Sequence, residues 1–280
     1  MADSSSFRSI DGEAERARWT ASADAWDRWA DPMADLADKL NQPLLDAAGV
    51  SAGDRVLDLA SGAGEPALSA ALRAGPDGLV VGSDLVPGMM AGALRRAAGI
   101  ADGRRPVFTA ADMTALPFAA GTFDRVTCRF GIMFVPDVAA ALAELRRVLR
   151  PGGRAAFMVW GPRAGNALFD TVGEAVAARL GEDRSLDPLF RFAAPGTLAE
   201  PMRAAGFATV TETDITPVRK APRGQPFWRA TLEMSFGHRL HALSAEQRAE
   251  LDTEVTRRFD AQAQDGTIPL PIHVRIVTGF

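Results

Sequence analysis

Short apolar runs alternate with longer segments of helical period along much of this chain. Between residues 53 and 160, runs rich in Val, Leu and Phe are each followed by apolar residues that recur every three or four positions. Alternation of this kind is typical of βαβ units and predicts a parallel sheet. The expected strands and helices are residues 55–60, 66–73, 79–84, 87–98, 106–111, 123–129, 138–149 and 154–160.

The N-terminal part has the pattern of a helix. Over residues 13–40, Trp19, Trp26, Trp29 and Met33 recur at intervals of seven, three and four positions, which places them on one helical face. An aromatic stripe of this kind usually packs against the rest of a protein. We therefore expect residues 1–45 to form an N-terminal helical cap.

The C-terminal part is less regular. The expected elements are helices at residues 164–180 and 197–205, a polar loop at 183–185 and an extended run at 208–216. Residues 217–271 are too long for a simple hairpin, and their helical periodicity at 226–243 and 245–264 favours a lid. Residues 273–279 have the pattern of a last strand.

The first strand of the series ends in an acid and a glycine turn. Residues 56–64 read Val-Leu-Asp-Leu-Ala-Ser-Gly-Ala-Gly, and the next helix is expected to begin at about Glu65. Gly62 and Gly64 allow backbone angles that a side chain would forbid, and they let a ligand lie against the peptide groups. Free N–H groups at the start of the next helix would face the same ligand. The turn therefore predicts a nucleotide-cofactor site.

The spacing of this turn is compatible with two cofactors. Gly62, Gly64 and Ala67 also satisfy the fingerprint of NAD-binding proteins, and Asp84, at the end of the second apolar run, can accept ribose hydroxyls in either case. Asp58 distinguishes the two, because a carboxylate near the turn repels a pyrophosphate and attracts an ammonium group. S-adenosylmethionine has that ammonium group and no phosphate, so it is the cofactor we favour.

Several segments, in order, resemble class I S-adenosylmethionine-dependent methyltransferases, of the group that includes the ubiquinone and menaquinone C-methyltransferases. They are residues 56–64, 82–90 (Gly-Ser-Asp-Leu-Val-Pro-Gly-Met-Met), 110–113 (Ala-Ala-Asp-Met), 118–124 and 144–153 (Glu-Leu-Arg-Arg-Val-Leu-Arg-Pro-Gly-Gly). Two residues depart from the pattern of the group. Ser61 stands where Cys or Gly is usual, and Glu65 stands where a third Gly is common.

The resemblance implies a doubly wound, Rossmann-like α/β fold. Its sheet is expected to be seven-stranded and mostly parallel, with an antiparallel last strand that inserts beside the preceding two. The chain would then consist of the N-terminal helical cap (1–45), a core that binds S-adenosylmethionine (46–217), an inserted helical lid (218–268) and a final core strand (269–280).

The resemblance also implies which residues contact the cofactor. Asp58 would lie near the methionyl amino group, Gly62 and Gly64 would pass close to the cofactor, and Asp84 would hold the ribose. The other candidates are Ala60 and Leu85 beside these, Met89 or Met90 along the adenine, Asp112 and Met113 at its outer edge, and Arg129, Phe130 and Phe134 after the fourth strand.

Trp26 is a further candidate for the cofactor site. An indole face over the sulfonium would attract this cation by about 0.5–2 kcal/mol, and Trp26 or Trp29 could supply it. Packing of the first helix is the other explanation of these two residues.

An acceptor that must lose a proton needs a base, and histidine has a pKa near neutrality. His238 and His241 share one face of the helix expected at residues 226–243 and are our candidates for this base, the alternative being surface or packing residues. Phe227 and Met234 fall on the same face, and the other face carries Trp228, Leu232, Phe236 and Leu240. His273 is expected to be structural. Two histidines without a Cys or carboxylate partner fall short of a ligand set, so no metal site is expected.

Composition narrows the choice of compartment and partner. A net charge of −4 and a pI of about 5.5 argue against a general nucleic-acid enzyme. Cys128 is the single cysteine, which excludes an internal disulfide and fits a reducing compartment. Residues 1–12 are polar, and no apolar run is long enough to span a bilayer, so we expect a cytoplasmic protein without stable membrane insertion. The sequence leaves a homodimer open.

The function favoured by these observations is methyl transfer from S-adenosylmethionine to a small, largely apolar or aromatic acceptor, on carbon or oxygen. A quinone precursor or another natural product would suit an aromatic lid. The first alternative is a non-catalytic protein that binds S-adenosylmethionine. The second is an NAD-dependent oxidoreductase, which is disfavoured because Asp58 repels a phosphate and the chain has no tyrosine for a Tyr-Lys proton relay.

Overall fold

The computed structural model describes residues 10–100, 105–184 and 188–280, so most of the polar start and Ser185 of the polar loop lie outside the described residues. A seven-stranded sheet with the order β3-β2-β1-β4-β5-β9-β6 forms its centre. The strands are β1 (Arg55–Leu59), β2 (Leu79–Asp84), β3 (Val107–Ala110), β4 (Phe123–Arg129), β5 (Leu149–Trp160), β6 (Val210–Ile215) and β9 (Val274–Gly279).

The pairing of the strands confirms the predicted topology. The strands β3, β2, β1, β4 and β5 are parallel to their neighbours, whereas β9 is antiparallel to both β5 and β6 and lies between them. Buried apolar runs form the central strands, and Val56, Leu57 and Leu59 of β1 are at most 1% exposed. Cys128 is also fully buried, in β4, as a strand residue of this pattern should be.

Helices wind around this sheet in both directions from β1. Right-handed crossovers lead outward from β1 to β3 and, in the opposite direction, from β4 to β5, which places the connecting helices on opposite faces. This is the doubly wound α/β arrangement that the sequence predicted. The helices are α2 (Ala34–Ala48), α3 (Ala67–Ala74), α4 (Pro87–Ala97), α5 (Val138–Val148), α6 (Ala167–Leu180) and α7 (Ala199–Ala204), with short 3₁₀ turns at Ile132–Phe134, Arg163–Gly165 and Pro188–Phe190.

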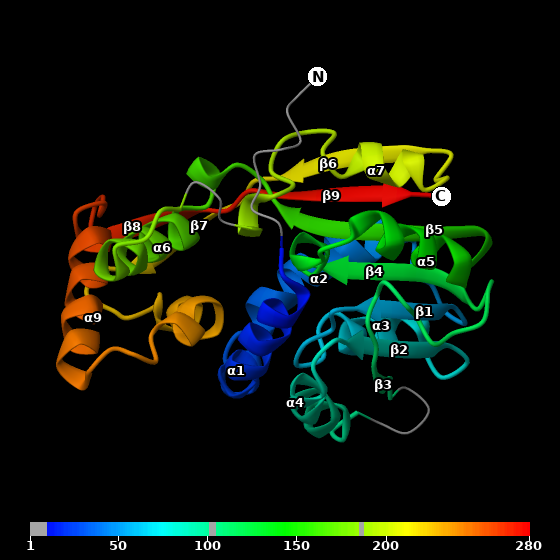
Figure 1. Cartoon of the computed structure of the whole chain (residues 1–280), viewed down its shortest axis with the longest axis horizontal. Helices are drawn as coiled ribbons and strands as arrows, with labels where there is room; N and C mark the ends of the chain where they lie inside the picture. Colours follow the sequence, from blue (N-terminus) through cyan, green and yellow to red (C-terminus); the bar gives the residue numbers. More distant parts are fainter. Residues whose placement is uncertain (1–9, 101–104, 185–187) are drawn as a thin grey trace.

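The carboxyl ends of the parallel strands face the N-terminal helix α1 (Gly12–Ala30) and the lid segment, residues 218–268. In Figure 1, α1 (blue) lies between these strand ends and the lid segment (yellow to orange). The strand order reverses at β1 and β4, and in open parallel sheets ligands bind beside such a reversal.

One long helix was predicted at residues 13–40, and this was wrong, since the structure has two helices. The first, α1, ends at Ala30, and α2 begins at Ala34 after a turn. Pro32 stands in the break and has no N–H to donate to the preceding turn, and the next residue, Met33, leaves the helical conformation with a φ of −100° and a ψ of 1°.

The lid segment also differs from its prediction. It begins with a strand, β7 (Val218–Pro222), which pairs antiparallel with β8 (Thr267–Pro271) in a second sheet that the sequence reasoning missed. The helix expected at 226–243 is broken into α8 (Arg229–Thr231), a π-helical turn (Leu232–Phe236) and a 3₁₀ turn (Gly237–Arg239). The second predicted helix is present as α9 (Ala245–Asp260), which a capping box of Ser244 and Gln247 begins.

The lid segment shares its apolar core with the sheet. Trp228, Leu232, Phe236, Val255 and Phe259 are buried in the same hydrophobic cluster as the central strands. The segment is therefore packed as part of the main fold. Among the described residues, no helix has the length and apolar character that crossing a membrane would require.

Candidate functional site

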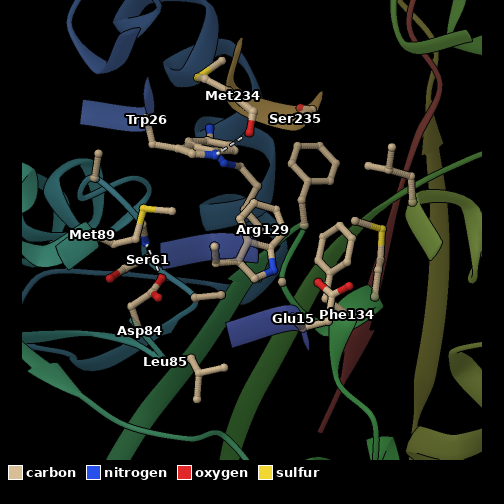
Figure 2. Close-up of a pocket in the computed structure, with 18 of the residues that line it drawn as sticks. Glu15, Trp26, Ser61, Asp84, Leu85, Met89, Arg129, Phe134, Met234 and Ser235 are labelled. Atoms are coloured by element: carbon tan, nitrogen blue, oxygen red, sulfur yellow. Dashed lines mark hydrogen bonds between the residues drawn. The ribbon is translucent and has the colours of Figure 1, made fainter. Parts of the chain in front are cut away.

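A cavity of about 780 Å³ opens at the carboxyl ends of the parallel strands. Its lining comes from the turn after β1, from the ends of β2 and β4, from α1 and α6, and from the lid segment. Figure 2 shows side chains from these elements pointing toward a common space. Segments distant in sequence therefore form one site.

The glycine turn forms the floor of the cavity at β1. Ala60 and Gly62 both have positive φ angles, of 52° and 53°, and both line the cavity. A Cβ added to Gly62 would meet no protein atom within 4 Å, so this peptide group is open to a ligand. Gly64 does not line the cavity, and a Cβ there would lie 2.9 Å from Leu68 Cδ1. Gly64 is needed for the packing of α3 and α4 on the turn.

Asp84 closes the turn from the neighbouring strand. Its carboxylate accepts hydrogen bonds from Gly62 N and Val86 N, each at 2.9 Å, and it lines the cavity although only 9% exposed. Burial raises the pKa of Asp84 above its usual value. The adjoining wall is lined by Leu85, Met89, Asp112 and Met113. Met90 is not part of the lining.

Asp58 takes a different position from the one that the resemblance implied. It is fully buried and does not line the cavity. Its carboxylate accepts a hydrogen bond from Thr127 Oγ1 at 2.7 Å and one from Ala67 N, the first residue of α3, at 3.1 Å. Asp58 thus caps the helix and joins β1 to β4. The expected free N–H of Ala67 is occupied by this carboxylate.

A pH effect on stability follows from this burial. Desolvation raises the pKa of Asp58 to about 7 from 3.8, while Thr127 opposes the shift. Between pH 4 and pH 7 the folded protein then holds a proton that the unfolded chain has released, so the free energy of unfolding falls as the pH rises. Relative to Asp58→Asn, which cannot titrate there, the wild type should lose about 2 kcal/mol between pH 5 and pH 8 in urea unfolding. No relative change over this range would mean that Asp58 is held ionised in the folded protein.

Arg129 brings a half-buried positive charge to the cavity wall. Its Nη1 donates to Ala37 O at 3.2 Å and to Asn41 Oδ1 at 2.8 Å, and no other nitrogen of this side chain bonds to a described residue. Burial lowers the pKa of Arg129, although Glu65 and Asp58 oppose this. A guanidinium with free donors in a closed cavity is suited to an anionic group of a ligand.

Glu65 lies beside Arg129 and was not predicted as a site residue. Its carboxylate accepts from Asn41 Nδ2 at 2.7 Å and Ser69 Oγ at 3.0 Å, and it forms an ion pair with Arg96 at 3.0 Å. Both Glu65 and Arg96 line the cavity. The departure of Glu65 from the usual glycine was the sequence signal for this role, whereas nothing in the sequence marked Asn41.

Aromatic rings line the rest of the cavity on two sides. Phe130, with a φ of 60°, stacks on Trp160 with 4.1 Å between the ring centroids and 4° between the ring planes. The ring centroid of Phe169, on α6, lies 4.5 Å from that of Trp160. On the other side, Trp19 of α1 lies 4.9 Å from Phe134. Sequence reasoning missed Trp160 and Phe169, because both have the pattern of ordinary core residues.

The tryptophan stripe of α1 lines the cavity instead of packing wholly into the core. Trp19, Trp26, Trp29 and Met33 are all in the lining. Trp26 Nε1 donates to Met234 O of the lid segment at 3.2 Å (Figure 2), and Trp29 Nε1 donates to Glu233 Oε2 at 2.8 Å. Trp26 and Trp29 of the stripe therefore connect α1 to the lid segment by hydrogen bonds at the cavity.

The histidines lie outside the cavity lining. His238 is half-buried, and burial, aided by Arg18, lowers its pKa to about 4, while His241 is exposed. The predicted helix that would have turned them inward is interrupted at the π-helical turn, so Met234 reaches the cavity and the two histidines do not. His273 Nε2 lies 3.4 Å from Asp214 Oδ2, again outside the lining. The geometry gives no support to a histidine base.

Comparison with known protein families identifies the central segment. Residues 57–157, from β1 to β5, match a family model described as "Methyltransferase domain". The chain is 32% identical over 248 residues to a nocamycin O-methyltransferase of Saccharothrix syringae, covering 84% of this chain and 88% of that protein. It is 39% identical over 166 residues to a demethylmenaquinone methyltransferase of Thermus thermophilus, covering 55% and 74% of the two chains.

Solved structures agree on the fold. The YcgJ protein of Bacillus subtilis superposes with a TM-score of 0.55 at 22% identity, covering 85% of this chain and 96% of that one. The [4+2]-cyclase SpnF superposes with a TM-score of 0.54 at 20% identity, covering 86% of this chain and 79% of that one. At these identities the likeness concerns the arrangement of the strands and helices.

Proposed function

Because this chain belongs to the S-adenosylmethionine-dependent methyltransferases, we propose that it methylates a hydroxyl oxygen of a small, planar aromatic acceptor. The observation that carries this proposal is the lining of the cavity. Two pairs of aromatic rings that contact each other line the cavity that contains the glycine turn, Phe130 with Trp160 and Trp19 with Phe134. Such walls suit a flat, largely apolar molecule.

The cofactor fits the polar half of the cavity. Asp84 is in reach of ribose hydroxyls, with Leu85 and Met89 beside the adenine and Asp112 and Met113 at its edge. The open face of Gly62 leaves room for the cofactor against the backbone. When bound, S-adenosylmethionine supplies an electrophilic methyl group on its sulfonium.

The methionyl end is assigned to Arg129 and Glu65. The free donors of Arg129 suit its carboxylate, and the carboxylate of Glu65 suits its ammonium group. This assignment replaces the one for Asp58, because Glu65 lines the cavity whereas Asp58 is fully buried outside the lining. Arg96 is less suited to the carboxylate, because its donors already bind Asp31, Ala63 O and Glu65.

Alignment and exclusion of water are the catalytic contributions that this cavity supports. The aromatic walls hold a flat acceptor in one plane, and α1 with the lid segment closes the cavity through Trp26 and Trp29. Trp26 lines the same space and can face the sulfonium with its ring.

Oxygen is favoured over carbon as the methylated atom by the extent of the similarity. The O-methyltransferase is matched over 84% of this chain, which is more than the cofactor-binding core, whereas the demethylmenaquinone methyltransferase is matched over 55%. Carbon methylation of a quinone precursor is the second candidate, supported by that second relative.

The test is transfer of a labelled methyl group from S-adenosylmethionine to chosen acceptors. We expect labelled ethers from 2-naphthol and 2-hydroxy-1,4-naphthoquinone, and no product from ethanolamine, with mass spectrometry locating the label on oxygen or carbon. Label on a ring carbon would favour the second candidate. Binding of S-adenosylmethionine without transfer to either aromatic compound would contradict the proposed acceptor class.

A further inference from the structure

The lid segment presents two hydroxyl groups to the acceptor half of the cavity. Thr231 and Ser235 lie four residues apart, at the end of α8 and in the π-helical turn, and both line the cavity. They are only 4% and 8% exposed. In Figure 2, Ser235 lies beside Met234 on the lid segment, on the opposite side of the view from Asp84 and Leu85.

Neither hydroxyl has a hydrogen-bond partner among the residues that the structure describes. Other hydroxyls on helices donate to the carbonyl four residues earlier, as Ser22 does to Arg18 O and Thr256 to Asp252 O. Neither oxygen is completely buried, so each keeps some surface that is open to the cavity. Two unpaired hydroxyls open to one cavity are available to bind a ligand.

Two of the other polar groups of this half of the cavity, Asn166 and the pair of Glu15 and Arg18, already have hydrogen-bond or ion-pair partners. The amide of Asn166 bonds to Pro162 O and to the backbone of His273, at 2.9–3.1 Å. Glu15 and Arg18 form an ion pair at 3.3 Å. The unpaired hydroxyls of Thr231 and Ser235 can both donate to a ligand and accept from it.

The π-helical turn holds these hydroxyls in place. Turns of this kind are rare and occur mostly at functional sites. Met234, within the turn, accepts the indole hydrogen bond of Trp26 at 3.2 Å, which fixes the turn against α1. The position of Ser235, the next residue, is therefore set by α1 as well as by the lid segment.

We infer that Thr231 and Ser235 bind a neutral carbonyl or hydroxyl oxygen of the acceptor, an inference that rests on the proposed function. The acceptor then carries a second oxygen besides the one that is methylated, as a hydroxyquinone does. A pair of uncharged hydroxyls is suited to such an oxygen, whereas a phosphate or carboxylate would favour a cation beside it.

Two probes test this inference. Both 6-hydroxy-1-tetralone and 2-naphthol have a phenolic hydroxyl group that is neutral at pH 7 and can be methylated, but only the first has a ring carbonyl. In calorimetry with the protein saturated with S-adenosylhomocysteine, we expect the tetralone to bind at least about tenfold more tightly. In Thr231→Val/Ser235→Ala this preference should fall to about twofold with the affinity for 2-naphthol unchanged, since a neutral hydrogen bond is worth about 0.5–1.5 kcal/mol.

The controls separate recognition from folding. Thr256→Val removes a hydroxyl that bonds within α9, far from the cavity lining, and should leave both affinities unchanged. Thr231→Ser/Ser235→Ala keeps one of the two hydroxyls and should show more of the preference than the double variant Thr231→Val/Ser235→Ala. If both probes bind and the double variant keeps the wild-type preference, the inference is wrong while the proposed function stands. If S-adenosylhomocysteine binds but neither probe does, the aromatic acceptor itself is wrong.

Discussion

Replacing Asp84 by alanine is expected to weaken binding of S-adenosylmethionine and S-adenosylhomocysteine by about 100-fold or more. The carboxylate accepts from Gly62 N and Val86 N and faces the cavity, so its loss loosens the glycine turn and removes an acceptor for the ribose. Hydrogen bonds to charged groups are worth about 1.5–3 kcal/mol each, and about 2.7 kcal/mol corresponds to 100-fold. Titration calorimetry measures the effect directly.

Two variants serve as controls for Asp84. Asp46→Ala removes an acid on α2 that pairs with Arg73 away from the cavity, and should leave cofactor affinity unchanged. Asp112→Ala removes an exposed acid that bonds to Thr114, and should cost about tenfold or less. Wild-type affinity in Asp84→Ala would show that the ribose lies elsewhere.

Replacing Arg129 by methionine is expected to weaken binding of S-adenosylmethionine by about 100-fold while leaving 5′-methylthioadenosine within about twofold. The second ligand keeps the adenine, ribose and sulfur but lacks the amino-acid group. A difference between the two ligands therefore reports on the methionyl carboxylate, which we assign to the free donors of Arg129. Competition calorimetry with both ligands gives the ratio.

The matched control for Arg129 lies on the same strand. Arg125→Met removes a guanidinium that pairs with Asp54 at 3.1 Å outside the cavity. This variant should therefore keep the wild-type ratio of the affinities for S-adenosylmethionine and 5′-methylthioadenosine. An equal loss for both ligands in Arg129→Met would overturn the assignment. Arg129 would then act through the fold, by holding Ala37 and Asn41 in position.

The sheet and the glycine turn were predictable because their signals are local. Apolar runs of strand length alternate with segments of helical period, and this pattern alone indicates a parallel sheet. The turn at Gly62 and the acid at Asp84 stand at the ends of adjacent strands, where a parallel topology must bring them together. The predicted antiparallel last strand, β9, is confirmed by its pairing with β5 and β6.

The lid segment was predicted less well because its conformation depends on distant contacts. The pairing of β7 with β8 joins residues about fifty positions apart, and neither strand has a strong alternating pattern. The π-helical turn is fixed by Trp26 of α1, more than two hundred residues earlier in the chain. Periodicity within residues 226–243 could not reveal this contact, so it placed His238 and His241 on a face that does not form.

The sequence by itself determined the doubly wound sheet and the glycine turn, since each depends on residues close together in the chain. The class of cofactor followed from several segments that resemble one family in the same order, and not from Asp58, which is buried outside the cavity. Only the tertiary structure decided which charged groups reach the cavity. Burial and hydrogen bonds turned Asp58 into a helix cap and left donors of Arg129 free. The polar contacts of the acceptor half were decided in the same way, because Thr231 and Ser235 face the cavity only through the packing of the lid segment on α1.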